Sequence, residues 1–207
     1  MQNKEPLISG NYYHIYNMGI NGCNLFYQNK NFKHFLNLYE KYIDSIADTY
    51  AWCLMPNHFH LLVRIKEEEE IGYYLPLNNE KLKNLSEVEK PERVFENKDK
   101  FISKDYNKFK TVAFLNSEGS GDSFRLKKPN PTNHFSHLFN SHTKAINKQE
   151  TRTGSLFQHP FRRIRIDKED YLKKLIIYIH TNPIKHGFVK NCIDYPRSSY
   201  HSIINNI

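Results

Sequence analysis

The sequence of 207 residues has a mass of 24.7 kDa and a net charge of +8 at pH 7. This length predicts one domain with room for a large insertion, and the 14% aromatic content excludes full disorder. No run of 18 apolar residues is present and the N-terminus lacks the apolar stretch of a signal peptide, so we expect a soluble cytoplasmic protein without a membrane span. Three isolated cysteines indicate neither a disulfide scaffold nor a cysteine-based zinc site.

Apolar periodicity predicts seven helices and strands, which lie before and after the charged middle segment. In order, they are a strand over 12–17, a helix over 32–46, strands over 50–55 and 58–65, a helix over 135–148, a strand over 161–166 and a last helix. Asp167 is the predicted N-cap of this last helix, which should end near the Asn-Pro pair at 182–183. The order predicts an α+β fold in which helices cover an antiparallel sheet.

Charge is unevenly distributed along the chain. Residues 66–130 hold 13 basic and 13 acidic groups, which predicts a charge-balanced, partly mobile insertion. Residues 151–207 hold 10 basic and 4 acidic groups, so +6 of the net +8 lies in this basic C-terminal part. Its arginines and lysines are interleaved with aromatic residues. This pattern fits either a phosphate-binding surface or an ordinary solvated basic face.

The sharpest chemical feature is a pair of histidines in the strand over 58–65. Side chains two residues apart in a strand point to the same face, so His58 and His60 lie together, roughly 7 Å apart at their Cβ atoms. Two imidazoles at this spacing suit one metal ion that keeps positions open for water or a phosphate oxygen. The alternative is two strand histidines that bind no ligand.

Five short motifs in a fixed order carry a family resemblance. They are YHIYNMGING at 13–22, WCLMPNHFHLLV at 52–63, RTGSLFQ at 152–158, YIHTNPIKHG at 178–187 and YPRSSY at 195–200. Together they resemble the REP-associated tyrosine transposases, which are relatives of small insertion-sequence transposases in the HUH single-strand nuclease superfamily. The motifs span residues 12–65 and 133–200, so the resemblance covers all but the insertion and the ends.

The resemblance implies one ferredoxin-like HUH domain over residues 1–207, with Mg²⁺ or Mn²⁺ bound by His58 and His60. In such enzymes a tyrosine attacks single-stranded DNA and forms a 5′-phosphotyrosine link, as a step in DNA transposition. The implied partner is single-stranded or hairpin DNA, which would associate the protein with the bacterial nucleoid. The resemblance leaves open whether the protein is a monomer or a homodimer.

One position departs from the family pattern. The relatives have a tyrosine shortly after the Leu-Phe-Gln block, and here Phe161 stands at that place. Three interpretations remain open. Tyr171 or Tyr178, seven residues apart on the last helix, replaces the nucleophile, or packs against the sheet as an ordinary aromatic. A metal ion activates water instead. Or cleavage is lost, and the protein is a non-catalytic single-strand or hairpin DNA-binding protein.

Seven basic residues are the candidates for contacts with the DNA backbone. They are Arg152, Arg162, Arg163, Arg165, Lys173, Lys174 and Lys185. Phe161 shares a strand face with Arg163 and Arg165, so it either stacks against a base or belongs to the core. His14 and Tyr16 belong to a strand that we expect beside the histidine strand, so they are candidates for lining a DNA-binding groove. For His180 and Asn182 we favour structural capping over catalysis.

Overall fold

The computed structural model describes residues 5–71, 73–76, 99–103 and 129–204. They form two compact units, Met1–Lys66 with Pro131–Ile207, and Glu67–Asn130. The elements of the first unit are β1 (Tyr12–Met18), η1 (Ile20–Gly22), α1 (Asn29–Ile43), β2 (Ala47–Met55), β3 (His58–Ile65), α4 (Pro131–Gln149), β6 (Arg162–Ile166), α5 (Glu169–Lys185), η4 (Cys192–Asp194) and α6 (Tyr200–Ile204). Those of the second are α2 (Glu68–Ile71), β4 (Tyr73–Pro76) and β5 (Asp99–Ser103).

The first unit is built on a four-stranded sheet with the order β2-β3-β1-β6. Every neighbouring pair is antiparallel. With α1 between β1 and β2, and α4 between β3 and β6, this is the βαββαβ arrangement of a ferredoxin-like fold. The predicted α+β class, with helices on an antiparallel sheet, is confirmed.

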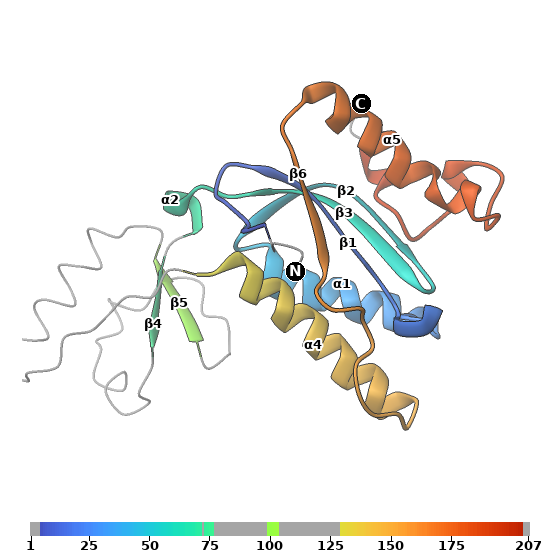
Figure 1. Cartoon of the computed structure of the whole chain (residues 1–207), viewed down its shortest axis with the longest axis horizontal. Helices are drawn as coiled ribbons and strands as arrows, with labels where there is room; N and C mark the ends of the chain where they lie inside the picture. Colours follow the sequence, from blue (N-terminus) through green and yellow to red (C-terminus); the bar gives the residue numbers. More distant parts are fainter. Residues whose placement is uncertain (1–4, 72, 77–98, 104–128, 205–207) are drawn as a thin grey trace, which may run out of the picture. The chain divides into compact units, whose positions relative to one another are not determined.

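Strand alternation divides the sheet into two faces that are covered differently. Tyr13, Ile15 and Phe59 lie on one face and are fully buried. This face packs against α1 and α4, where the Phe59 ring contacts Phe35 and Phe139 at centroid distances of 5.5 Å each. Figure 1 shows these two helices on one side of the sheet and α5 on the other. We call the side that carries α5 the histidine face, because His58 and His60 lie on it.

Helix α5 covers part of the histidine face with an apolar stripe. Leu175 and Ile179 pack against residues of β2, β3 and β6, which are Ala51, Cys53, Met55, Leu62 and Ile166. The helix begins after Lys168 rather than after the predicted N-cap Asp167. The Asp167 carboxylate accepts a hydrogen bond from Arg165 Nε at 2.6 Å, so it does not cap the helix. The helix also continues past the predicted end at 182–183 to Lys185, with Pro183 buried inside it.

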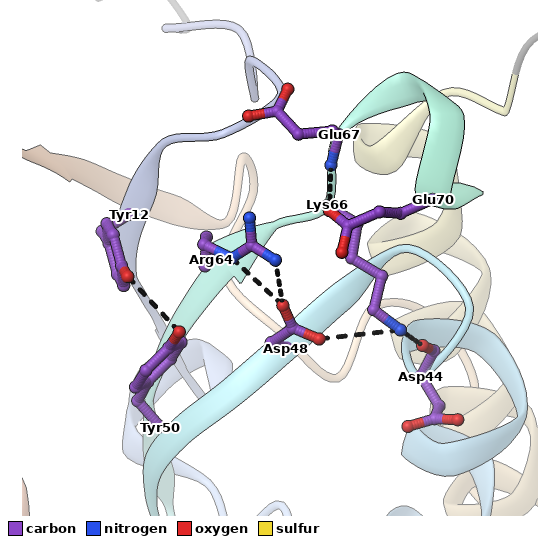
Figure 2. Close-up of polar contacts among 8 residues, drawn as sticks. All are labelled: Tyr12, Asp44, Asp48, Tyr50, Arg64, Lys66, Glu67 and Glu70. Carbon is purple, nitrogen blue, oxygen red and sulfur yellow. Dashed lines mark hydrogen bonds and ion pairs between the residues drawn. The ribbon is translucent and has the colours of Figure 1, made fainter.

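A charged cluster of Asp48, Arg64 and Lys66 stabilises the register of β2 against β3 at one end of the sheet (Figure 2). Asp48 and Arg64 are cross-strand partners, and Arg64 donates to the Asp48 carboxylate from Nη2 at 2.6 Å and from Nε at 3.1 Å. Lys66 adds an ion pair with Asp48 at 3.7 Å and donates to the carbonyl of Asp44, just after α1, at 2.6 Å. A slip of one residue would turn the histidine pair to the other face, so this register matters to the site.

The second unit contains the acidic helix α2 and the two-stranded antiparallel sheet β4-β5. The mobility predicted for the insertion falls mostly on residues 77–98 and 104–128, which lie outside the described residues. In the part of the chain that the structure describes, no helix combines the length and the apolar character that a membrane span requires.

Stability is expected to fall in mild acid because of His142 in α4. This side chain is fully buried, its Nε2 contacts the carbonyl of Leu25 at 2.9 Å, and burial lowers its pKa from 6.5 to about 4. Between pH 6.5 and pH 4, His142 is protonated in the unfolded chain but stays neutral in the folded one. The free energy of unfolding therefore decreases as pH falls through this range. His142 alone should cost about 2 kcal/mol between pH 7.5 and pH 5.

Chemical unfolding at the two pH values measures this loss. In His142→Gln the amide keeps a donor for the Leu25 carbonyl but does not titrate, so this variant should lose correspondingly less stability in acid. An equal loss in the two proteins would show that His142 is not responsible.

Candidate functional site

His58 and His60 lie side by side on β3, as predicted from their spacing. Their ring centroids are 5.4 Å apart and the rings are nearly perpendicular, at 85°. His60 is buried, with 7% of its surface exposed, whereas His58 is half-buried. The register places Met18 opposite His58 and Tyr16 opposite His60, so the neighbouring strand β1 supplies the next side chains of the site.

Two further histidines adjoin the pair. His14 of β1 is buried, and its Nε2 lies 2.9 Å from Nδ1 of His60 in a hydrogen bond. Tyr16 stacks on His14 with a centroid distance of 4.6 Å. On the other side, His186 follows directly after α5, and its ring lies 4.9 Å from that of His58. The predicted proximity of His14 and Tyr16 to the histidine strand is therefore confirmed.

The pKa values of His14, His58 and His60 are lowered, which favours their neutral form. Burial lowers the pKa of His60 to about 3, with a further contribution from the nearby His14, His58 and His186. Burial also lowers the pKa of His14 to about 4. The pKa of His58 is lowered by burial and by His186. Neutral imidazole is the form of histidine that ligates metal ions.

Helix α5 brings Tyr178 to this cluster. The ring of Tyr178 lies edge-on to His60 at a centroid distance of 5.3 Å and to His14 at 6.3 Å. Tyr178 is 37% exposed, so solvent reaches it. Tyr171 lies two turns earlier on the helix, about 10 Å further along its axis, and no ring contact joins it to these histidines in the described chain. Of the two tyrosines singled out from the sequence, only Tyr178 adjoins the histidine pair.

Asn182 follows Tyr178 by one helical turn. It is 1% exposed, and among the described residues the only side-chain interaction of its amide is with His58. This interaction opposes the lowering of the His58 pKa. The rest of the amide's hydrogen-bonding capacity is buried and unused, which costs about 1–3 kcal/mol, so its position beside His58 favours a ligand rather than a cap.

The histidine pair alone provides two ligands, so a divalent ion would need at least one further ligand from another residue. The described residues contain no group of three or more His, Cys, Asp or Glu side chains arranged around a common metal position. Two neutral imidazoles and the amide oxygen of Asn182 are the donors that the chain offers here. Imidazole is an unusual ligand for Mg²⁺, which prefers oxygen, so this set fits Mn²⁺ better.

Phe161 does not belong to this site. It is 8% exposed and packs against Phe135 and Phe139 of α4, with centroid distances of 5.8 and 5.3 Å. Helix α4 covers the opposite face of the sheet from the histidines (Figure 1). The guanidinium of Arg163 lies 4.7 Å from the Phe161 centroid, and Arg163 donates to Thr132 Oγ1 at 2.9 Å. The core interpretation of Phe161 is therefore confirmed, and the base-stacking one is wrong.

The basic residues singled out from the sequence are dispersed around the sheet. Arg162 lies 6.0 Å over the ring of Tyr16, and Lys185 lies 4.6 Å over that of Tyr178, so these two flank the histidine cluster. Three others are engaged locally. Arg152 donates to the Ser155 carbonyl, Arg165 pairs with Asp167, and Lys173 pairs with Glu169 at 2.7 Å. Lys174 is exposed on α5.

Sequence reasoning underrated Asn182 and His186. Residues 178, 182 and 186 are four apart, a spacing that places them on one face of a helix. This spacing was not used, because the helix was expected to end near 182–183.

Comparisons with known proteins give the same resemblance in sequence and in fold. No family model matches the chain. A Haemophilus influenzae protein named as a REP-associated tyrosine transposase is 25% identical over 156 residues, which are 74% of this chain; the match spans 59% of that relative's length. A solved REP-associated tyrosine transposase bound to a REP hairpin shares the fold, with a TM-score of 0.59 and 15% identity, over 99% of this chain and 86% of that one.

Proposed function

We propose that this protein, which resembles REP-associated tyrosine transposases in sequence and fold, binds single-stranded or hairpin DNA and cleaves one phosphodiester through a covalent tyrosine intermediate. The observation that carries the proposal is the contact of Tyr178 with the histidine pair, 5.3 Å from ring to ring at His60. A hydroxyl-bearing side chain at a pair of neutral imidazoles is the combination that nucleophilic attack on a phosphodiester needs.

His58, His60 and the Asn182 side chain are the proposed ligands of a divalent ion, Mn²⁺ or Mg²⁺. The buried amide of Asn182, whose only side-chain interaction among the described residues is with His58, supports its part in this set. When bound, such an ion would offset negative charge on the scissile phosphate. Its remaining coordination positions would be open to phosphate oxygens.

The chain's own part in the reaction is to present the nucleophile and hold the backbone. Tyr178 Oη forms a bond to phosphorus, and the bond from phosphorus to the 3′ oxygen breaks. The products are a 5′-phosphotyrosine and a free 3′-hydroxyl. The phenolic proton leaves to solvent, which reaches the 37%-exposed Tyr178, and the departing 3′ oxygen takes up a proton. Lys185 and Arg162, beside Tyr178 and Tyr16, are placed to pair with the phosphates on either side.

A second candidate function is DNA binding without cleavage. It is favoured by one observation, that the described residues contain no group of three or more His, Cys, Asp or Glu side chains around a common metal position. In this case the same basic and aromatic surface would hold the DNA, and the histidine pair would be a relic.

Incubation of the full chain with labelled single-stranded hairpin DNA and Mn²⁺ separates these functions. We expect cleavage and a covalent protein–DNA adduct on a denaturing gel, both lost in His58→Ala. His201→Ala, an exposed histidine of α6 outside the site, is the matched control and should retain both. Binding without cleavage, unchanged by His58→Ala, would establish the second function, and cleavage without an adduct would indicate attack by water.

A further inference from the structure

We infer that His14 is a positioning residue that fixes the tautomer of His60, so that Nε2 of His60 carries the lone pair offered to a metal ion. The inference rests on the proposed metal site, but it concerns a residue to which neither the spacing of the motif nor the comparisons assign a role. It starts from the 2.9 Å hydrogen bond between His14 Nε2 and His60 Nδ1, which is buried inside the sheet.

A neutral imidazole has one protonated nitrogen and one lone pair, so the two ends of His60 are linked. If Nδ1 of His60 donates to His14, its Nε2 lone pair is available to a metal. If Nδ1 accepts, Nε2 carries the proton and cannot ligate. Acting as the acceptor, which is the role we infer for it, His14 selects the competent form of His60. This requires the proton of His14 to reside on its own Nδ1.

The second histidine of the pair has the same arrangement. Nδ1 of His58 lies 2.7 Å from Oδ1 of Asn57. A carbonyl oxygen only accepts hydrogen bonds, so Nδ1 of His58 must donate and its Nε2 keeps the lone pair. Both candidate ligands thus donate from Nδ1 to a neighbour and present Nε2. This is how metal-ligating histidines are usually held, although the acceptor is more often a carboxylate or a carbonyl.

The surroundings of His14 hold its ring in place. The centroid of its ring lies 4.6 Å from that of Tyr16, 5.1 Å from that of His60 and 6.3 Å from that of Tyr178. These contacts fix the ring plane, and with it the direction of Nε2 toward His60. A neutral acceptor at this point adds no negative charge to the site, unlike the carboxylate of other metal centres.

Long-range ¹H–¹⁵N spectra of the metal-free full chain with labelled histidines test the inference directly. We expect His60 protonated on Nδ1 alone and His14 unprotonated on Nε2. His14→Leu should allow the Nε2-protonated form of His60 and weaken Mn²⁺ binding by about 10-fold or more, measured by titration calorimetry. His14→Gln, whose amide oxygen reaches about the position of Nε2, should restore the tautomer and most of the affinity.

His180→Gln is the matched control, because His180 is also buried and hydrogen-bonded, to Ser199 Oγ at 2.9 Å, but lies outside the pair. It should leave the spectrum of His60 and the Mn²⁺ affinity unchanged. Wild-type His60 protonated on Nε2, or a His14→Leu protein with unaltered tautomer and affinity, would overturn the inference. So would a Mg²⁺-induced shift of His14 Nε2 equal to those of His58 and His60, since His14 would then be a ligand.

The tautomer is read without metal or DNA, so its outcome is separate from that of the cleavage assay. A protein that shows the expected tautomer but forms no adduct would contradict the proposed reaction and leave the arrangement of His14 and His60 established.

Discussion

Replacing Tyr178 with phenylalanine is expected to abolish the covalent protein–DNA adduct while hairpin DNA binding remains. The substitution removes only the hydroxyl, and Tyr178 is 37% exposed, so the edge-on packing of the ring against His60 and the stability of the helix should change little. The phenol is the proposed nucleophile, and no other group of the ring can bond to phosphorus. Denaturing gels with labelled DNA measure the adduct, and gel shifts without metal measure binding.

Tyr171→Phe is the matched control, because the same hydroxyl is removed from a tyrosine of similar exposure on the same helix. It should form the adduct at the wild-type level. The double variant Tyr178→Phe with Phe161→Tyr should remain inactive, since residue 161 packs against α4 on the face away from the histidines. An adduct that survives in Tyr178→Phe would eliminate Tyr178, and one that reappears in the double variant would restore the role of position 161.

Phe59→Ala is expected to destabilise the protein by about 3–5 kcal/mol. The Phe59 ring is fully buried and contacts Phe35, Phe139 and Phe157, so it joins the sheet to both α1 and α4. Removing it leaves a cavity where two helices meet one strand. Urea unfolding followed by circular dichroism measures the free energy of unfolding.

Phe188→Ala provides the comparison, because Phe188 is 48% exposed and its loss should change the free energy of unfolding by about 0.5 kcal/mol or less. A loss in Phe59→Ala no larger than that in Phe188→Ala would contradict the packing described for this core. In the sequence Phe59 lies between His58 and His60, but its side chain points to the opposite face of β3. Its removal therefore affects the histidine pair only through any disturbance of the strand.

The fold and the histidine pair were predictable because local patterns determine them. Period-two alternation in residues 58–65 places His58 and His60 on one face wherever the strand lies in the sheet. The helical stripe through Leu175 and Ile179 similarly determines which side of α5 faces the core. The predicted boundaries differ by up to four residues, the largest difference being at α4, which begins at Pro131. The start of α5 differs because Asp167 is engaged with Arg165.

The strand that lies beside the histidine pair was predicted, but the hydrogen bond between His14 and His60 was not, because it depends on the pairing between distant segments. The contact of His14 with His60 requires the register of β1 against β3, which the 39 residues between the two strands do not reveal. The two interpretations of Phe161 could not be separated from the sequence for a related reason. A motif alignment places a residue in order along the chain, but the strand β6 decides which face it occupies, and here that is the face of α4.

The site is assembled from two halves of different origin. The sheet supplies His14, His58 and His60, whereas one continuous helix, α5, and its C-cap supply Tyr178, Asn182 and His186. The phase between the halves is set by the apolar stripe of Leu175 and Ile179, which packs α5 against the sheet. Inserting one residue into α5 after Ile179, with the sheet and its pairing intact, would rotate Asn182 and His186 by about 100° about the helix axis while Tyr178 stayed in place. One inserted residue would therefore separate the proposed nucleophile from the other helix-borne groups of the site without replacing any residue of either half.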